Sequence, residues 1–335
     1  MKIRGLGIDI PDKQVDGRQR VLKETLARAQ TVGFSVAELP IPGLNVIMNG
    51  ELVPARVEAI REVVAPFDLR FSVHAPGRTN LAFGQDPDME RRVLEACVRF
   101  THAVGGRVLV YHSGLQALDA ARTGTARLPS EDELARGAER EVAALKELAP
   151  IAQDLGVIIG MENGDPHLWE YAVLMREGKP RDDLGHYHAR MKTSEIVAQA
   201  EAVNHASVGI TLDLAHLHLA TRALGEDFLE AVSTAAPWVC HVHINDNFGK
   251  LDAGFDAEGD RLTYGEADLH LPPGWGQIPF AAAFDRLADY AGEIILEIKA
   301  RYRDHLAEAL NNTRRILVDS GHEIQGRRSL PEARR

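Results

Sequence analysis

Residues 157–161 read VIIGM, and residues 293–298 read EIILEI. Both runs are short and rich in apolar, β-branched residues, as strands of a parallel sheet are when both of their faces are buried. Runs of this kind recur along the chain. The candidate strands are residues 3–10, 34–41, 69–75, 107–112, 156–162, 208–213, 238–244 and 293–298.

Amphipathic helical patterns separate these runs, and glycine or proline marks most of the junctions. Examples of such helices are residues 17–31, 53–64, 88–104, 130–155, 280–290 and 304–320. Eight strand–helix units in 335 residues predict an α/β protein that forms a (β/α)8 TIM barrel. A doubly wound open sheet is the alternative, although no glycine-rich fingerprint follows the first strand.

We expect a single barrel domain over residues 1–322 and a polar, basic, frayed tail over residues 323–335. Two connections are long, at about residues 163–191 and 246–279. Both follow strands on the face where barrel enzymes place their active sites. These two loops are therefore predicted to cover the site.

Composition limits the partners of the protein. The 38 lysines and arginines against 49 aspartates and glutamates leave a formal net charge of −11, which disfavours binding to nucleic acid. Two cysteines, Cys97 and Cys240, lie in apolar stretches and argue for a reducing compartment. No signal peptide and no membrane-length apolar run is recognisable. We expect a cytoplasmic protein with a small-molecule substrate and no membrane partner, and the oligomeric state stays open.

Ionisable side chains gather at the carboxyl ends of the predicted strands and in the loop after the seventh. In a barrel these ends form one ring, so the side chains converge on one mouth. Buried charges without partners cost several kcal/mol each, and divalent cations remove that cost. Mixed imidazole and carboxylate ligands suit zinc or manganese. The nine candidate ligands are His74, His112, Glu162, Asp213, His216, His243, Asp268, His270 and Glu297.

The number of metal ions is open at this stage. One dication held by Glu162, Asp213, His243 and Glu297 would leave a net charge of −1, and five candidate ligands would have other roles. Three dications with all nine ligands would leave a surplus of +2, which suits a hydroxide and an anionic phosphate.

Several other residues are weaker candidates. Lys299, Arg301 and Trp275 are candidate substrate contacts, although an outward ion pair or a loop position explains them equally well. His241 shares a face with His243 and is interpreted as a deeper supporting or core group. Asp9, at the end of the first strand, is interpreted as a structural hydrogen-bonding group.

The ordered series HAP (74–76), YHSG (111–114), ENG (162–164), DLAH (213–216), HIND (243–246), DLH (268–270), PPGWG (272–276) and LEI (296–298) resembles the xylose isomerase-like TIM barrel superfamily. That superfamily includes endonuclease IV and many sugar isomerases and epimerases. The endonuclease IV pattern implies that Glu162 bridges metal ions and that the other eight candidate ligands complete a trinuclear cluster. The epimerase pattern implies one metal ion on Glu162, Asp213, His243 and Glu297, with the two glutamates as acid and base.

Three functions follow from this interpretation. The first is a phosphodiesterase-like, metal-dependent phosphoester hydrolase that uses three metal ions and a metal-bound hydroxide. The alternative is a metal-dependent isomerase or epimerase of a sugar or sugar phosphate, with Glu162 and Glu297 as the acid/base pair. The third is a metal-binding or partner subunit without activity. The first two strand–helix loops carry little positive charge, so cleavage of DNA is not expected.

Overall fold

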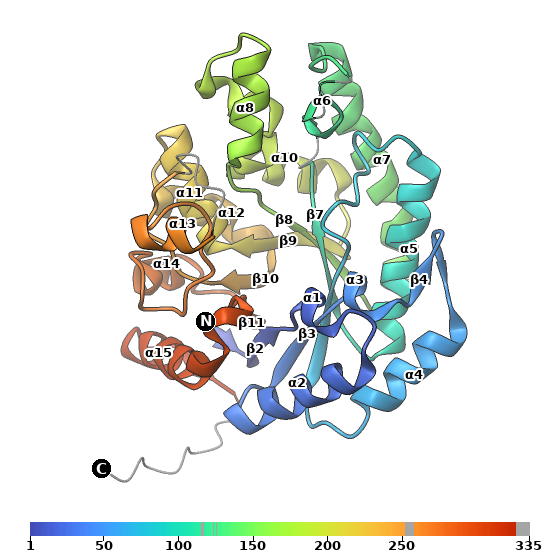
Figure 1. Ribbon diagram of the computed structural model, residues 1–335, viewed down its shortest axis with the longest axis vertical. Helices are drawn as coiled ribbons and strands as arrows, with labels where there is room; N and C mark the ends of the chain where they lie inside the picture. The colour runs from blue at the N-terminus through green and yellow to red at the C-terminus, as the bar shows by residue number, and fades with distance from the viewer. Residues whose placement is uncertain (115–116, 123, 125, 252–257, 326–335) are drawn as a thin grey trace.

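The computed structural model describes residues 1–114, 117–122, 124, 126–251 and 258–325 of the chain. Eight parallel strands close into a barrel, which confirms the predicted (β/α)8 fold and excludes the open sheet (Figure 1). Going round the barrel, the strands are β2 (Gly5–Asp9), β3 (Val36–Pro40), β6 (Arg70–His74), β7 (Val108–His112), β8 (Ile158–Glu162), β9 (Val208–Asp213), β10 (Val239–Ile244) and β11 (Glu293–Leu296).

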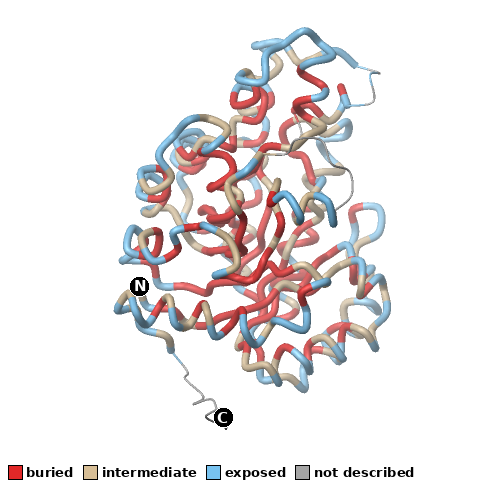
Figure 2. Tube along the Cα trace, turned by 60° about the vertical axis from the view of Figure 1, so that its left-hand side comes forward, coloured by how far each residue is buried: buried red, intermediate tan, exposed pale blue. Residues whose placement is uncertain are grey.

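Helices surround the barrel, and Figure 2 shows buried strands at the centre with exposed chain on the outer side. The helices are amphipathic, with one apolar and one polar face. On the apolar face of α5, for example, Leu94, Cys97 and Val98 are buried. The longer helices are α2 (Gln19–Val32), α4 (Pro54–Val64), α5 (Pro87–Ala103), α7 (Glu131–Asp154), α10 (Thr193–Val203), α11 (Leu214–Leu224), α12 (Phe228–Ala235), α14 (Phe280–Arg286) and α15 (Leu306–Asp319).

Short elements fill the connections. They are α1 (Asp12–Val15), α3 (Ile41–Leu44), β4 (Ile47–Met48), β5 (Glu51–Leu52), α6 (Asp119–Arg122), η3 (Ala236–Trp238) and η4 (Ala300–His305). No helix among the described residues is both long and apolar enough to cross a membrane.

The start of the chain differs from the prediction. The predicted first strand is divided into β1 (Lys2–Ile3) and β2, and only β2 enters the barrel. β1 pairs in parallel with β12 (Glu323–Ile324), and the amide of Gln325 donates a hydrogen bond to the Ile3 carbonyl at 2.8 Å. The expectation of a frayed tail from residue 323 is therefore wrong for these residues, because backbone pairing holds them. Residues 326–335 of the predicted tail lie outside the described residues.

Both long connections contain helices that the sequence patterns did not predict. The first contains α8 (Leu168–Arg176), η1 (Arg181–Asp183), α9 (Leu184–Tyr187) and η2 (Ala189–Met191), and α8 stands beyond one end of the barrel (Figure 1). The second contains α13 (Glu258–Tyr264), and its residues 252–257 lie outside the described residues.

The carboxylate of Asp246 organises the remainder of the second connection. It accepts hydrogen bonds from the amides of Gly274, Gly276 and Ile278 at 2.8, 2.9 and 3.2 Å. A Cβ atom at Gly276 would lie 2.4 Å from the carbonyl oxygen of Asn247 and from Asp246 Oδ1. The PPGWG segment therefore needs glycine at this position so that the backbone can approach the carboxylate.

Candidate metal centre

The ends of four strands bring Glu162, Asp213, His243 and Glu297 together, and we call these residues the inner quartet. All four are buried, and one ligand atom from each lies within 4.8 Å of the others. His243 Nδ1 is 3.0 Å from Glu162 Oε1 and 3.2 Å from Glu297 Oε1. Three carboxylates and an imidazole at this spacing form a ligand set for a divalent cation.

The other candidate ligands form two groups beside the inner quartet. In the first outer group, His112 Nε2 and His74 Nε2 lie 2.8 and 3.5 Å from Glu162 Oε2. In the second outer group, His216 Nε2 lies 3.9 Å from Asp268 Oδ2, which also contacts His270 Nε2. Each group is compact enough to hold an ion, and Glu162 belongs both to the quartet and to the first outer group. The structure thus gathers all nine predicted side chains into these three groups.

Unpaired buried atoms test whether these residues fit a metal ion. Asp213 Oδ2 and Asp268 Oδ1 are buried and accept no hydrogen bond from any residue that the structure describes. Burial and the charges of Glu297 and Glu162 raise the pKa of the Asp213 carboxyl to about 7, despite the opposing effect of His216. A dication would satisfy the unpaired oxygens and offset the carboxylate repulsion, so the residues fit one.

In the first outer group, the charged forms of Glu162 and His74 are stabilised because each side chain faces a partner of opposite charge. Burial disfavours the charged form of Glu162, but His112 and His243 hold the pKa of its carboxyl well below the usual range. Burial likewise disfavours a charged His74, and the hydrogen bond to Glu162 nevertheless raises the pKa of His74 to about 9. Metal binding at this group would therefore release a proton from His74.

Local structure fixes Asp213 at the start of α11. Its Oδ1 accepts hydrogen bonds from the amides of Ala215 and His216 at 2.6 and 2.7 Å, which caps the helix. Asn163 reaches across from the end of β8, accepting a hydrogen bond from the Asp213 amide at 2.8 Å and donating one to its carbonyl at 3.0 Å. The sequence interpretation assigned no role to Asn163, although the ENG motif contains it.

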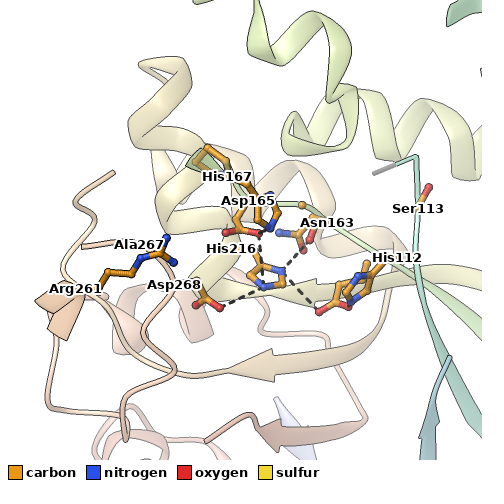
Figure 3. A pocket seen from close by; sticks show the side chains of 12 residues that line it. His112, Ser113, Asn163, Asp165, His167, His216, Arg261, Ala267 and Asp268 are labelled. Atoms are coloured by element: carbon orange, nitrogen blue, oxygen red, sulfur yellow. Dashed lines mark hydrogen bonds and ion pairs between the residues drawn. The ribbon is translucent and has the colours of Figure 1, made fainter. Parts of the chain in front are cut away.

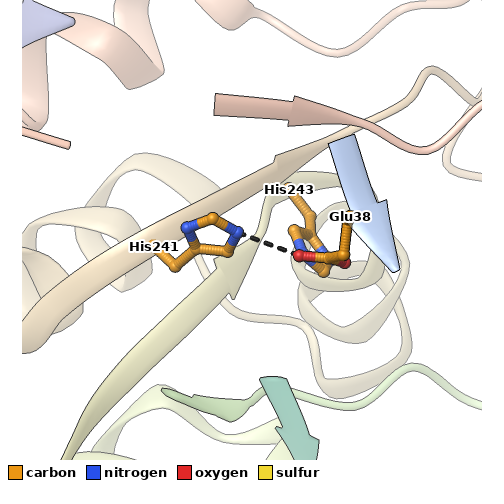
Figure 4. A group of neighbouring side chains, drawn as sticks. All are labelled: Glu38, His241 and His243. Atoms are coloured by element: carbon orange, nitrogen blue, oxygen red, sulfur yellow. Dashed lines mark hydrogen bonds and ion pairs between the residues drawn. The ribbon is translucent and has the colours of Figure 1, made fainter. Parts of the chain in front are cut away.

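A buried glutamate supports His243 from the side opposite the inner quartet (Figure 4). Glu38 Oε1 is 3.1 Å from His243 Nε2, and Glu38 Oε2 accepts hydrogen bonds from Ser72 Oγ at 2.8 Å and from His241 Nε2 at 3.1 Å. Burial opposes ionisation of Glu38, yet His243 and His241 hold the pKa of its carboxyl well below the usual range. The prediction that His241 is a deeper supporting group agrees with these contacts, and Glu38 was not predicted.

A cavity of about 240 Å³ opens beside Glu162 of the inner quartet, and Figure 3 shows side chains that line it. Glu162, His216 and Asp268 form one wall, and Asp165, His167 and Arg261 also line it. A second cavity, of about 220 Å³, reaches Glu297 and His74 from the side of Asp9 and Asp12. The site is therefore open to a ligand of small-molecule size.

Asp9 Oδ1 accepts a hydrogen bond from the Ile298 amide at 3.1 Å, as its structural interpretation predicted.

The predicted substrate contacts lie in three different settings. Lys299 Nζ donates a hydrogen bond to the Asp268 carbonyl at 2.9 Å, so this lysine supports the second outer group. The exposed Arg301 lies over the Tyr302 ring, with its Cζ 5.6 Å from the ring centroid. Trp275 Nε1 donates to Glu308 at 2.9 Å, and its ring packs on His305. These contacts direct Trp275 toward the surface near α15, so they do not place it with the ligand groups.

Comparisons with known proteins identify the family of this chain. A family described as xylose isomerase-like TIM barrel matches residues 26–317. A protein of Methanocaldococcus jannaschii, described only as uncharacterised, is 23% identical over 276 residues, which are 79% of this chain and 77% of the relative.

Three solved structures share the fold. A D-tagatose 3-epimerase-like protein has a TM-score of 0.65 at 16% identity, covering 94% of this chain and 98% of its own. D-psicose 3-epimerase from Clostridium cellulolyticum H10 has a TM-score of 0.62 at 15% identity, covering 93% and 99%. An L-ribulose 3-epimerase has a TM-score of 0.60 at 17% identity, covering 98% and 100%. The family match covers most of the sequence, and this chain therefore belongs to the xylose isomerase-like TIM barrel family.

Proposed function

We propose that the protein is a metal-dependent isomerase or epimerase of a sugar, with Glu162 and Glu297 as its acid/base pair. The observation that carries this proposal is the placement of both glutamates within about 3 Å of His243 Nδ1, each beside a cavity. The names of the three solved structures, all sugar 3-epimerases or epimerase-like, favour the same reaction class. This was the alternative at the sequence level, and it now takes precedence over phosphoester hydrolysis.

Each of the two glutamates lines a different cavity: Glu162 lines the larger one and Glu297 the smaller one. One carboxylate removes a proton from a carbon next to the sugar carbonyl, and the other returns a proton to carbon. A divalent ion on the inner quartet would polarise the carbonyl and lower the barrier to that proton transfer. Glu38 holds His243 with its Nδ1 toward the quartet, and Asn163 holds Asp213.

The test is a panel of unphosphorylated ketoses and ketose phosphates with metal-loaded protein. Manganese and zinc are supplied separately, and products are separated by chromatography. We expect a new epimer or aldose from at least one sugar, and loss of that product in Glu297→Gln. No product from any sugar with verified metal loading would refute the proposal.

Phosphoester hydrolysis is the second candidate, and the two outer groups favour it. A one-metal epimerase does not need His74, His112, His216, Asp268 and His270 as ligands, yet the structure holds them in two compact groups. None of the three solved structures named above is described as a hydrolase. The metal-to-chain ratio of protein purified without chelator separates the candidates. About three ions per chain with cleavage of aryl phosphodiesters would favour hydrolysis, and about one ion per chain with sugar turnover would favour epimerisation.

A further inference from the structure

The imidazole of His167 lies on the wall of the larger cavity and has no role in the proposed reaction. His167 lies at the start of α8 and lines the 240 Å³ cavity together with Glu162 and His216 (Figure 3). Its side chain is 37% exposed, so a ligand in the cavity can reach it. The sequence interpretation placed this residue inside a long loop and gave it no function.

Two buried groups hold the His167 ring from behind. Glu170 Oε2 is 3.2 Å from His167 Nδ1 and also accepts a hydrogen bond from the His167 amide at 3.1 Å. His188 Nδ1 lies 3.1 Å from Glu170 Oε1, and both of these side chains are fully buried. Nδ1 is therefore occupied by Glu170, and Nε2 is the ring nitrogen on the side of Asp165 and the cavity.

The backbone is shaped to allow this arrangement. His188 packs against the chain at Gly164, where a Cβ atom would lie only 2.1 Å from His188 Nε2. The glycine of the ENG motif thus lets the connection pass close to His188 while its next residues enter the cavity. The buried Glu170 carboxylate, paired with His188, thus holds the partly exposed ring of His167 in one orientation.

The carboxylate of Asp165 lies beside the imidazole of His167, so this part of the cavity wall offers both a hydrogen-bond acceptor and a hydrogen-bond donor. Asp165 Oδ1 is 3.5 Å from His167 Nε2, and both residues line the cavity. Burial alone would lower the pKa of His167, but Asp165 and Glu170 outweigh it and raise this pKa to about 9. His167 is then a donor, and Asp165 is an acceptor.

A sugar hydroxyl both donates and accepts, so it matches this donor–acceptor pair, whereas a phosphate at neutral pH offers acceptors only. Three carboxylates, those of Glu162, Asp165 and Asp268, line the same cavity together with Arg261 and three imidazoles, so the preference is local: a phosphate placed against His167 would lie beside the Asp165 carboxylate and be repelled by it. At this position the lining thus favours a neutral hydroxyl group over a phosphate.

We propose that Asp165 and His167 form a subsite that binds a hydroxyl group of an unphosphorylated polyhydroxy substrate, with Glu170 and His188 as positioning residues. This inference rests on the proposed function and narrows its substrate class from sugars and sugar phosphates to free sugars. His167 touches the substrate, and Glu170 acts only through the orientation of His167.

Steady-state kinetics with D-tagatose, D-psicose and L-ribulose test the subsite. His167→Asn keeps a residue suited to the start of a helix and removes the imidazole. Loss of a hydrogen bond from a charged donor predicts a KM raised by about tenfold or more, with kcat changed by less than about threefold. Glu170→Gln should raise KM in the same direction. His186→Gln is the matched control, because His186 lies close by in α9 but pairs with the exposed Glu131 instead of the cavity.

A binding arm separates failure of the subsite from failure of the proposed function. Isothermal titration of D-fructose and D-fructose 6-phosphate into metal-loaded protein needs no turnover. We expect the free sugar to bind more tightly than its phosphate and to lose about tenfold in affinity in His167→Asn. Tighter binding of the phosphate, equal binding of free sugar by His167→Asn and the wild type, or loss of a bound metal ion in His167→Asn would overturn the subsite. If the free sugar binds as expected but no sugar is turned over, the proposed function fails and the subsite stands.

Discussion

Replacing Glu38 by glutamine is expected to weaken metal binding at the inner quartet, although Glu38 is not among the proposed ligands. Glu38 Oε1 lies 3.1 Å from His243 Nε2, and both side chains are fully buried. A carboxylate beside Nε2 favours the tautomer that carries its hydrogen there, so that Nδ1, on the side of Glu162 and Glu297, can give up its proton and bind a cation. Glutamine keeps the size and one acceptor oxygen but loses the charge and can present its amide nitrogen to His243.

The expected loss in metal affinity is between tenfold and a hundredfold, which corresponds to about 1.4–2.7 kcal/mol. This range agrees with the roughly 1.5–3 kcal/mol that a hydrogen bond to a charged group contributes. Competition with a fluorescent zinc chelator measures the affinity. Nitrogen-detected NMR of the histidine rings reports directly which nitrogen of His243 carries the proton.

Glu141→Gln is the matched control because Glu141 is also a fully buried glutamate. Its Oε1 accepts hydrogen bonds from Tyr111 and Ser113 at 2.9 and 2.8 Å, and among the described residues none of its hydrogen bonds or ion pairs is with a candidate ligand. This variant should lose stability but keep its metal affinity within about twofold. A folded Glu38→Gln protein that binds zinc as tightly as the wild type would refute the positioning role of Glu38.

Three further outcomes are expected. Gly276→Ala should destabilise the protein by about 1–3 kcal/mol, seen as a lower urea midpoint with an unchanged slope, because the new Cβ would collide with Asp246. In metal-free protein, the stabilising ion pair of His167 with Glu170 and Asp165 should be fully present below about pH 6.5 and be lost as pH rises through 9, because folding raises the pKa of His167 to about 9. The difference in urea midpoint between the wild type and His167→Asn should therefore shrink over that interval, and a constant difference would contradict it. Removing bound metal with a chelator should lower the melting temperature, since an ion at a hundred times its Kd stabilises the folded state by about 2.7 kcal/mol; an unchanged melting temperature would mean that the inner quartet holds no ion.

The barrel and the nine candidate ligands were predictable because both depend on one regularity. In a closed parallel barrel all strands end on the same face, so residues at strand ends meet wherever they lie in the sequence. His74 and Glu297 are more than two hundred residues apart, yet both belong to one site for this reason. Element types followed from the apolar periodicity, whereas α14 ended earlier than its pattern, at Arg286.

The supporting residues were harder to predict because their roles depend on contacts that no local pattern encodes. Glu38 lies inside the apolar run VAELP, and only the cross-barrel approach of His243 shows why a charge is buried there. Glu170 and His188 are 18 residues apart in the first long connection, and they meet because α8 packs against α9, the helix that directly precedes His188. Trp275 looked like a substrate contact in a glycine-rich loop, but Glu308 of α15 is its hydrogen-bonding partner.

Exchange of solvent deuterium into a carbon-bound position of a ketose tests the central claim most directly, because it reports the proton transfer assigned to Glu162 and Glu297. Metal-loaded protein is incubated in D2O with D-tagatose, D-psicose or L-ribulose, and proton NMR follows the carbon-bound signals. The account predicts that the signal of one position next to the carbonyl disappears, and that Glu297→Gln slows this loss by about a hundredfold or more. Absence of exchange in every sugar at full metal loading, or equal exchange by the wild type and Glu297→Gln, would contradict the account.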